Sequence, residues 1–282
     1  MNRKYNHSLL KISSSDFIIV FGIFLDNTNL KLNDSIKEVI DKKRASVVYL
    51  NPVDNKKLEC ETSLNIKYEV GSEEGICALF LEYFVSKSSS YVREFIDDLD
   101  IGYLSAESSF GEEEFLNIVN LSKNKKNKRL VVGYDLFMHE RALNIAKLLG
   151  VLNKYSDFDI VLPDNLDTKY LNLIEDYNNE VLQDIGELKA YDGTIMYNYA
   201  QSNTNKLIGG ASFSKIAKIE DNDKIIIKYG NNSIKSIFKQ DPKIHGTIAL
   251  NVLNKKDPNG DVLNSSYGYK SIKIQKVDEN NE

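Results

Sequence analysis

Cysteine is scarce in this sequence, which holds only Cys60 and Cys77 among its 282 residues. Two thiols on their own cannot make a disulfide framework, a structural zinc site or an iron–sulfur cluster, so we expect a protein of the reducing cytoplasm. Cys77 lies in the apolar segment GICALFLEYF, where a buried thiol is inert. Cys60, in KLECET, lacks a histidine or helix terminus that would lower its pKa.

Long apolar runs and an excess of positive charge are also missing. No run approaches the ~20 apolar residues that span a bilayer. The apolar patch near the N-terminus is interrupted by Asp16 and precedes no small-residue cleavage site, so we interpret it as leading into a strand. The net charge of −5 argues against broad nucleic-acid binding. The basic run KNKKNKR (Lys123–Arg129) is best interpreted as a solvated loop, with a phosphate- or partner-docking patch as the alternative.

Glycine is too sparse at the strand ends for a phosphate cradle. The turn after Phe21 reads GIFLDNTN and the turn after Val132 reads GYDLFMHE, with one glycine each. Neither provides the G-x-G-x-x-G spacing that lets a backbone approach a pyrophosphate, and the sequence contains no Walker motif. We interpret both as plain glycines between a strand and a loop.

The three histidines, His7, His139 and His245, stand in different segments without a second ligand at metal spacing. His139 is followed by Glu140 but has no helical i+4 partner of the kind that makes a zinc pair. We interpret the histidines as surface or capping residues.

Serines and clustered acids are the remaining chemical candidates. No G-x-S-x-G elbow is present, and Ser108 and Ser109 stand beside a predicted capping box of Ser109 with Glu112. The groups DDLD (Asp97–Asp100) and EEE (Glu112–Glu114) are potential divalent-ion ligands or paired carboxylates. Solvated helix ends explain them better, the second being favourable to a helix dipole. The sequence thus assigns no catalytic, cofactor-binding or metal-ligating residue.

Short apolar runs alternate with amphipathic segments from Asp16 onward, a pattern typical of βαβ units and a parallel sheet. Runs that are apolar on both faces belong in a sheet covered on both sides. The predicted strands are 17–21, 46–50, 129–132 and 158–162, and the predicted helices are 35–43, 73–85, 112–121, 139–149 and 164–183, with a serine-rich loop at 86–91.

After Gly186 the period changes to that of short, β-branched strands bounded by Gly, Asn, Asp or Pro. Such spacing predicts a small β barrel, and YGNNS supplies the residues of a tight hairpin turn. The predicted strands are 192–199, 223–229, 233–239, 246–253 and 270–277. We therefore expect an α/β region with a Rossmann-like parallel sheet over residues 1–185 and a β-barrel domain over 186–282 with a frayed tail.

Several segments, taken in order, resemble the molybdopterin-oxidoreductase superfamily, and more narrowly the C-terminal part of the large, G-type subunit of the peripheral arm of bacterial NADH:quinone oxidoreductase, respiratory complex I. They are SSSDFIIVFGIFLDNTNLKLNDSIKEVIDKKRASVVYLNPVDN, IKYEVGSEEGICALFLEYFV, RLVVGYDLFMHERALNIAKLLGVLNKYSDFDIVLPD, ELKAYDGTI and IEDNDKIIIKYGNNSIKSIFKQDPKIHGTIALNV. The last is similar to the superfamily's double-psi β barrel. Asp192 stands where that family has glutamate, and Asn222-Asp223 replaces its Gly-Asp.

The resemblance implies a non-catalytic structural segment or homologue of that large subunit. It lacks the cysteine-rich region that holds the family's iron–sulfur clusters, so no cofactor is expected in this chain. Its implied partners are other peripheral-arm subunits, without nucleic acid and without direct membrane insertion. Its implied place is the cytoplasm, attached to the inner membrane's cytoplasmic face through the complex.

Two other functions remain open from the sequence. One is a molybdopterin- or nucleotide-binding oxidoreductase domain, in which the loops after Gly22, Asn51 and Gly133 line a cleft, because ligands of open α/β sheets bind at strand carboxyl ends. The other is a free-standing α/β module that binds a small anionic ligand.

Overall fold

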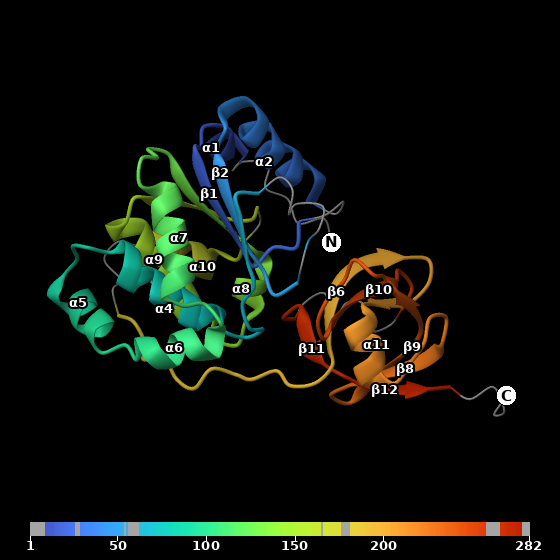
Figure 1. Cartoon of the computed structure of the whole chain (residues 1–282). Coiled ribbons are helices and arrows are strands. Elements are labelled where there is room, and N and C mark those ends of the chain that lie inside the picture. The colour runs from blue at the N-terminus through green and yellow to red at the C-terminus, as the bar shows by residue number, and fades with distance from the viewer. Residues whose placement is uncertain are drawn as a thin grey trace. The chain divides into compact units, whose positions relative to one another are not determined.

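The computed structural model describes residues 9–25, 29–53, 55, 62–164, 166–175, 181–257 and 266–277, so Cys60 and His7 lie outside the described residues. The chain divides into two compact units, 1–190 and 191–282, against an expected boundary between 185 and 186 (Figure 1). Each unit has its own sheet and its own core.

The first unit is built on a five-stranded parallel sheet, which confirms the predicted α/β class. Its spatial order is β3 (Leu64–Ile66), β2 (Ser46–Leu50), β1 (Phe17–Phe21), β4 (Lys128–Val132) and β5 (Phe158–Val161). All five β1 residues are buried, and alternate ones enter opposite cores, with Ile19 on one face and Ile18 on the other. The three-residue β3 was not predicted, because it is too short to show a period.

Helices cover both faces of this sheet (Figure 1). α1 and α2 pack on one face and the others contribute mainly to the second, larger core. Their bounds are α1 (Leu9–Ser13), α2 (Leu30–Lys43), α4 (Glu73–Phe84), α5 (Ser90–Asp97), α6 (Ile101–Ser108), α7 (Glu112–Ser122), α8 (Tyr134–Met138), α9 (Ala142–Tyr155) and α10 (Thr168–Glu175).

Several helix boundaries differ from the sequence prediction. α2 begins at Leu30 and not at Ser35, and the predicted helix 139–149 begins only at Ala142, after the separate α8. The predicted helix 164–183 is helical only in α10, and residues 181–190 are irregular. The serine-rich loop ends at Ser89, whose side chain caps α5 by accepting the Val92 N–H.

The predicted capping box of Ser109 and Glu112 is wrong by two residues. Ser109 adopts a left-handed conformation with φ 52° and ends α6, so it does not start α7. The N-cap of α7 is Gly111, whose N–H donates to Glu114 Oε2 at 2.9 Å. The acidic first turn of α7 is as expected.

The second unit is a curled, mixed, seven-stranded sheet, a half-barrel, as the predicted barrel-type domain requires. Its order is β11 (Tyr269–Ser271), β6 (Ile195–Ser202), β10 (Ile248–Asn254), β7 (Lys206–Gly209), β9 (Asn232–Gln240), β8 (Lys224–Tyr229) and β12 (Lys273–Lys276). The pairs β6/β10 and β7/β9 are parallel and the others antiparallel. α11 (Ala211–Ala217) buries Phe213 in the core of this unit.

The hairpin predicted around YGNNS is confirmed. β8 and β9 pair from Lys224 to Tyr229, and Tyr229 stands opposite Asn232 across a two-residue loop that opens with Gly230 at φ 50°. β7 and α11 were not predicted. The predicted strand 270–277 is two strands, because the chain passes at Ile272 from pairing with β6 to pairing with β8.

Candidate functional site

The carboxyl edge of the five-stranded sheet is where an open α/β fold places a ligand, at the point where β1 and β4 diverge. Here the loops after these strands pack backbone against backbone. A Cβ on Gly133 would lie 1.7 Å from the Gly22 carbonyl oxygen, and one on Gly22, which has φ 65°, would lie 2.2 Å from Leu136 Cδ1. The space beside these two glycines is therefore filled by the chain itself.

The third loop expected to line a cleft follows Asn51, and its residues 54 and 56–61 lie outside the described residues. Asn51 itself serves a local turn. Its Oδ1 accepts the Val53 N–H at 2.9 Å, and its own N–H donates to the Ile66 carbonyl at 3.2 Å. The side chain is buried at the end of β2, where it stabilises the turn that follows the strand.

A buried polar network occupies the segments that follow β3 and β4. Glu73 and Glu74 form the first turn of α4 and are 0% and 3% exposed. Arg141 Nε lies 3.0 Å from both carboxylate oxygens of Glu74, and Asn144 Nδ2 donates to Glu74 Oε1 at 2.7 Å. Carboxylates at a helix N-terminus also gain from the helix dipole. The Glu74 carboxylate is thus stabilised by the Arg141 guanidinium, the Asn144 amide and the dipole of α4.

His139 sits beside Glu73 in this network. Its Nε2 lies 3.1 Å from the Gly71 carbonyl and 3.7 Å from Glu73 Oε2, and its Nδ1 accepts the Arg141 N–H at 3.0 Å. An accepting Nδ1 carries no proton, so these contacts fit the neutral ring with its proton on Nε2. His139 is a capping residue, as expected, but it is buried and not on the surface.

The network also holds the strap, which we define as residues 181–189. Asn144 pairs with Gln183 as a strand neighbour would, accepting its N–H at 2.9 Å and donating to its carbonyl at 3.0 Å. Arg141 Nη2 donates to the Asp184 carbonyl at 2.9 Å, and the Leu188 N–H donates to the Tyr103 hydroxyl at 2.8 Å. Glu74 therefore orients both side chains that fasten Gln183 and Asp184.

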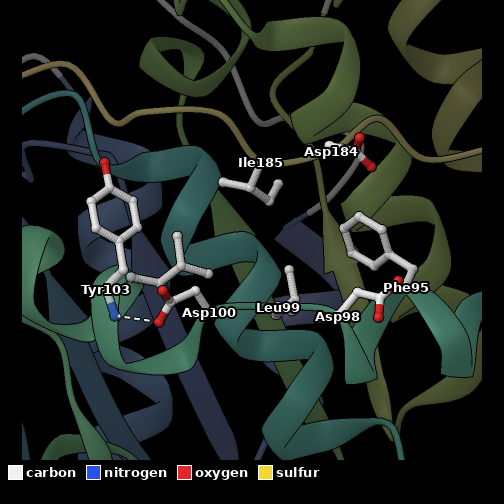
Figure 2. Close-up of a pocket in the computed structure, with 8 residues that line it drawn as sticks. Phe95, Asp98, Leu99, Asp100, Tyr103, Asp184 and Ile185 are labelled. Carbon is white, nitrogen blue, oxygen red and sulfur yellow. Dashed lines mark hydrogen bonds between the residues drawn. The ribbon is translucent and has the colours of Figure 1, made fainter.

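Between the strap and the α5–α6 corner lies a pocket of about 310 Å³ (Figure 2). Phe95, Leu99, Leu104 and Ile185 supply apolar walls, and Tyr103 adds a ring. The acidic groups of the pocket are Asp98, Asp100 and Asp184. Asp100 Oδ1 accepts the Tyr103 N–H and caps α6, as the dashed line in Figure 2 shows. All three aspartates are exposed.

The other candidates from the sequence have structural roles in the described residues. Cys77 is buried, and burial first and then the charges of Glu73 and Glu74 raise the pKa of its thiol well above the ordinary value, so it stays protonated. Ser108 Oγ donates to the Leu104 carbonyl at 2.6 Å. His245 is exposed in the second unit, and the described residues contain no group of three or more His, Cys, Asp or Glu that could hold a metal.

The basic run Lys123–Arg129 is a loop up to residue 127, as expected, and then enters β4. The Asp16 carboxylate accepts the N–H groups of Lys126 at 3.0 Å and Asn127 at 2.8 Å. Burial acts to raise the pKa of Asp16, but these two N–H groups and the Lys125 charge outweigh it, and the pKa lies below its ordinary value. The run is therefore anchored by an acid that precedes β1.

The buried network and the pocket were both missed from the sequence. Glu74 and Arg141 are separated by 67 positions, and Asp98 and Asp184 are brought to one pocket only by the course of the strap. The one available signal was the charged pair Glu73-Glu74 ahead of the apolar run 76–81 of α4, and this signal marks a helix N-terminus but does not identify a partner.

Comparison with known proteins gives a likeness in fold alone. No protein-family model and no curated protein matches the chain. Solved structures do match, among them acetylene hydratase from Pelobacter acetylenicus, over 88% of this chain and 73% of that one, with a TM-score of 0.47 and 8% identity. At this level the likeness concerns the course of the chain and carries no information on activity. Among the described residues, no helix has the length and apolar character needed to cross a bilayer.

Proposed function

We propose that this chain is a non-catalytic structural segment, a homologue of the large peripheral-arm subunit of NADH:quinone oxidoreductase, that docks onto other peripheral-arm subunits of respiratory complex I. In this proposal it contributes shape and contact surface at the cytoplasmic face of the inner membrane, and it holds no cofactor of its own. The ordered resemblance of its segments to that large subunit suggests the assembly.

The observation that carries the non-catalytic part of the proposal is the filled carboxyl edge. The Gly22 and Gly133 loops are in backbone contact beside Leu136, so the chain itself occupies the space directly against these two glycines. The N-terminus of α4, where a helix would attract a phosphate, carries Glu73 and Glu74 of the chain itself. Both features support a chain that holds no pterin or nucleotide cofactor at this edge.

The pocket of Figure 2 supports the docking part of the proposal. Its walls are apolar, and Asp98 and Asp184 make no ion pair within the part of the chain that the structure describes. A partner's lysine or arginine would place its aliphatic stem against Phe95 and Leu99 and its charge between the aspartates. We therefore assign the pocket as the contact for a basic side chain of a neighbouring subunit.

Co-purification tests the proposal. The tagged full chain, expressed in its own cell, is expected to bring down NADH dehydrogenase activity from solubilised membranes. Charge reversal of both Asp98 and Asp184 to lysine should remove that activity from the eluate. Reversal of Asp34 and Asp41, two exposed acids of α2 that form no ion pair within the described residues, is the matched control and should retain it. Failure of the unaltered chain to co-purify would refute the assembly role.

Metal and fluorescence analysis of the purified chain tests the non-catalytic part separately. We expect neither molybdenum nor tungsten and no pterin emission after release with acid. A stoichiometric pterin or a bound nucleotide would contradict the proposal and favour an oxidoreductase domain, whatever the outcome of the co-purification.

A further inference from the structure

The second unit carries a sheet face whose charge is of one sign. On β12, β8, β9 and β7 the side chains that point away from the core alternate with those on the core side, at two positions of β7, three of β8, four of β9 and two of β12. None of these outward positions is acidic, aromatic or arginine. Six are lysines, which we call the lysine face: Lys206, Lys224, Lys228, Lys235, Lys239 and Lys273.

Within the part of the chain that the structure describes, no acidic side chain neutralises these charges. Lys228 and Lys273 stand directly opposite each other in the β8/β12 register, and like charges in such a pair are destabilising. Lys239 donates to the side chain of Asn222, which is neutral. Asp223, the acid next to Lys224 in the sequence, pairs with Lys276 at 2.8 Å. Within the described residues, none of the six lysines forms an ion pair. The net charge of the whole chain is −5, so the lysine face is a local excess.

Apolar side chains lie within the lysine face. Ile237 is 39% exposed, stands opposite Lys224 on β8 and Lys206 on β7, and is surrounded by cations on both sides. Ile226, partly exposed, stands opposite Lys235. The face therefore combines a ring of ammonium groups with an isoleucine centre.

The composition of the face distinguishes among anionic partners. Sheets that bind single-stranded nucleic acid stack the bases on aromatic side chains, and this face has none. Protein interfaces are enriched in tyrosine, tryptophan and arginine and depleted in lysine. A fluid anionic bilayer, in contrast, offers no fixed geometry and attracts lysines as point charges, while small apolar side chains meet the headgroup boundary.

We propose that the lysine face docks the second unit onto an anionic phospholipid bilayer surface. The lysines lie against the headgroups, with the exposed Ile237 between them, and no segment inserts across the membrane. This inference rests on the charge of the face and does not depend on the function proposed above.

Vesicle co-sedimentation of the full chain is the test. Binding is expected to phosphatidylcholine vesicles rich in phosphatidylglycerol, to weaken as salt is raised, and to be absent with phosphatidylcholine alone. Each lysine at an anionic surface contributes roughly fivefold to the binding constant. The pair K228E and K235E should therefore lower binding by more than about 25-fold. K228E also places a carboxylate opposite Lys273, so the fold is not expected to suffer.

The matched control is the pair K215E and K243E, which changes the net charge equally at exposed positions on α11 and in the β9–β10 connection. It should bind as the unaltered chain does, and circular dichroism should show all forms folded. The neutral pair K228Q and K235Q should fall between the two. Equal loss in control and test pairs would overturn the proposal, as would absence of vesicle binding. Preferential binding to a single-stranded oligonucleotide would overturn it in favour of nucleic acid.

Discussion

Replacing Arg141 by methionine should open the strap and loosen the first unit. The substitution keeps an aliphatic stem and removes the guanidinium that lies 3.0 Å from both oxygens of Glu74. Breaking a buried ion pair from one side costs about 3–5 kcal/mol, because the remaining charge is left without compensation. The Glu74 side chain is 3% exposed and that of Arg141 is 36% exposed. Since Asn144 and the helix dipole still serve Glu74, we expect the lower end, about 3 kcal/mol.

Replacing the other partner of the ion pair, Glu74→Met, should lower the stability of the first unit by less than Arg141→Met does. It leaves a guanidinium that is already in contact with water and able to turn outward, so about 1–2 kcal/mol is expected from the lost charged hydrogen bonds. The double variant should resemble Glu74→Met alone, because no buried charge remains when both partners are gone. The order of the three variants follows from the difference in exposure between the two partners.

Hydrogen exchange measured by mass spectrometry is the suitable assay, because two units make a single unfolding free energy ill-defined. Peptides covering 181–189 report the Gln183 and Leu188 N–H groups directly. Arg141→Met should speed their exchange more than Glu74→Met does, while peptides of the second unit stay unchanged. An equal effect of the two variants, or effects within about 0.5 kcal/mol of the unaltered chain, would refute the reasoning.

Three further predictions follow from the same structure. Gly133→Ala should prevent the first unit from folding, since its Cβ would overlap backbone. Gly186→Ala, with nothing within 4 Å, should be neutral or stabilise the first unit by about 0.4–1 kcal/mol, measured by hydrogen exchange of its core peptides. Asp16→Asn should make stability depend less on pH in the acid range. The lowered pKa of Asp16 stabilises the fold above the ordinary value of 3.8, and this stabilisation is lost as pH falls through the lower folded pKa. An unchanged pH dependence below 3.8 would contradict this. In a Cys60→Ser background, Cys77 should react with a thiol reagent only on unfolding, and rapid labelling of the native chain would show that its burial is misjudged.

The parallel sheet could be predicted because its strands are buried on both faces. Phe17–Phe21 and residues 47–50 are continuous apolar runs, and this signal needs no knowledge of the neighbouring strands. The hairpin at Gly230 was equally local, since its turn residues are adjacent. Pairing between strands far apart in the sequence could not be predicted in this way. β7 is four residues long, and its pairing with the parallel strand β9 forms only in the folded sheet.

The buried network escaped prediction for the same physical reason. The carboxylate of Glu74 looks like an ordinary first-turn acid until Arg141 and Asn144 are brought to it from another part of the chain. The lysine face left a trace that was present in the sequence, because the lysines of KIIIKY and SIKSIFK are four positions apart and so lie on one face of each strand. Because successive side chains of a strand point to opposite faces, such a pattern predicts the charge of the outer sheet face as well as the strand itself.

The pairing of Asn144 with Gln183 has a consequence for where this protein can be cut. Residues 181–189 are irregular, and the Asn144 side chain makes the two backbone hydrogen bonds that a neighbouring strand would make. These bonds attach the segment to the first unit. A chain ending at residue 185, where the sequence suggests a boundary, would lose the N–H that Leu188 gives to Tyr103 and uncover the apolar surface beneath it. Separation of the two units should therefore fall after Ala190.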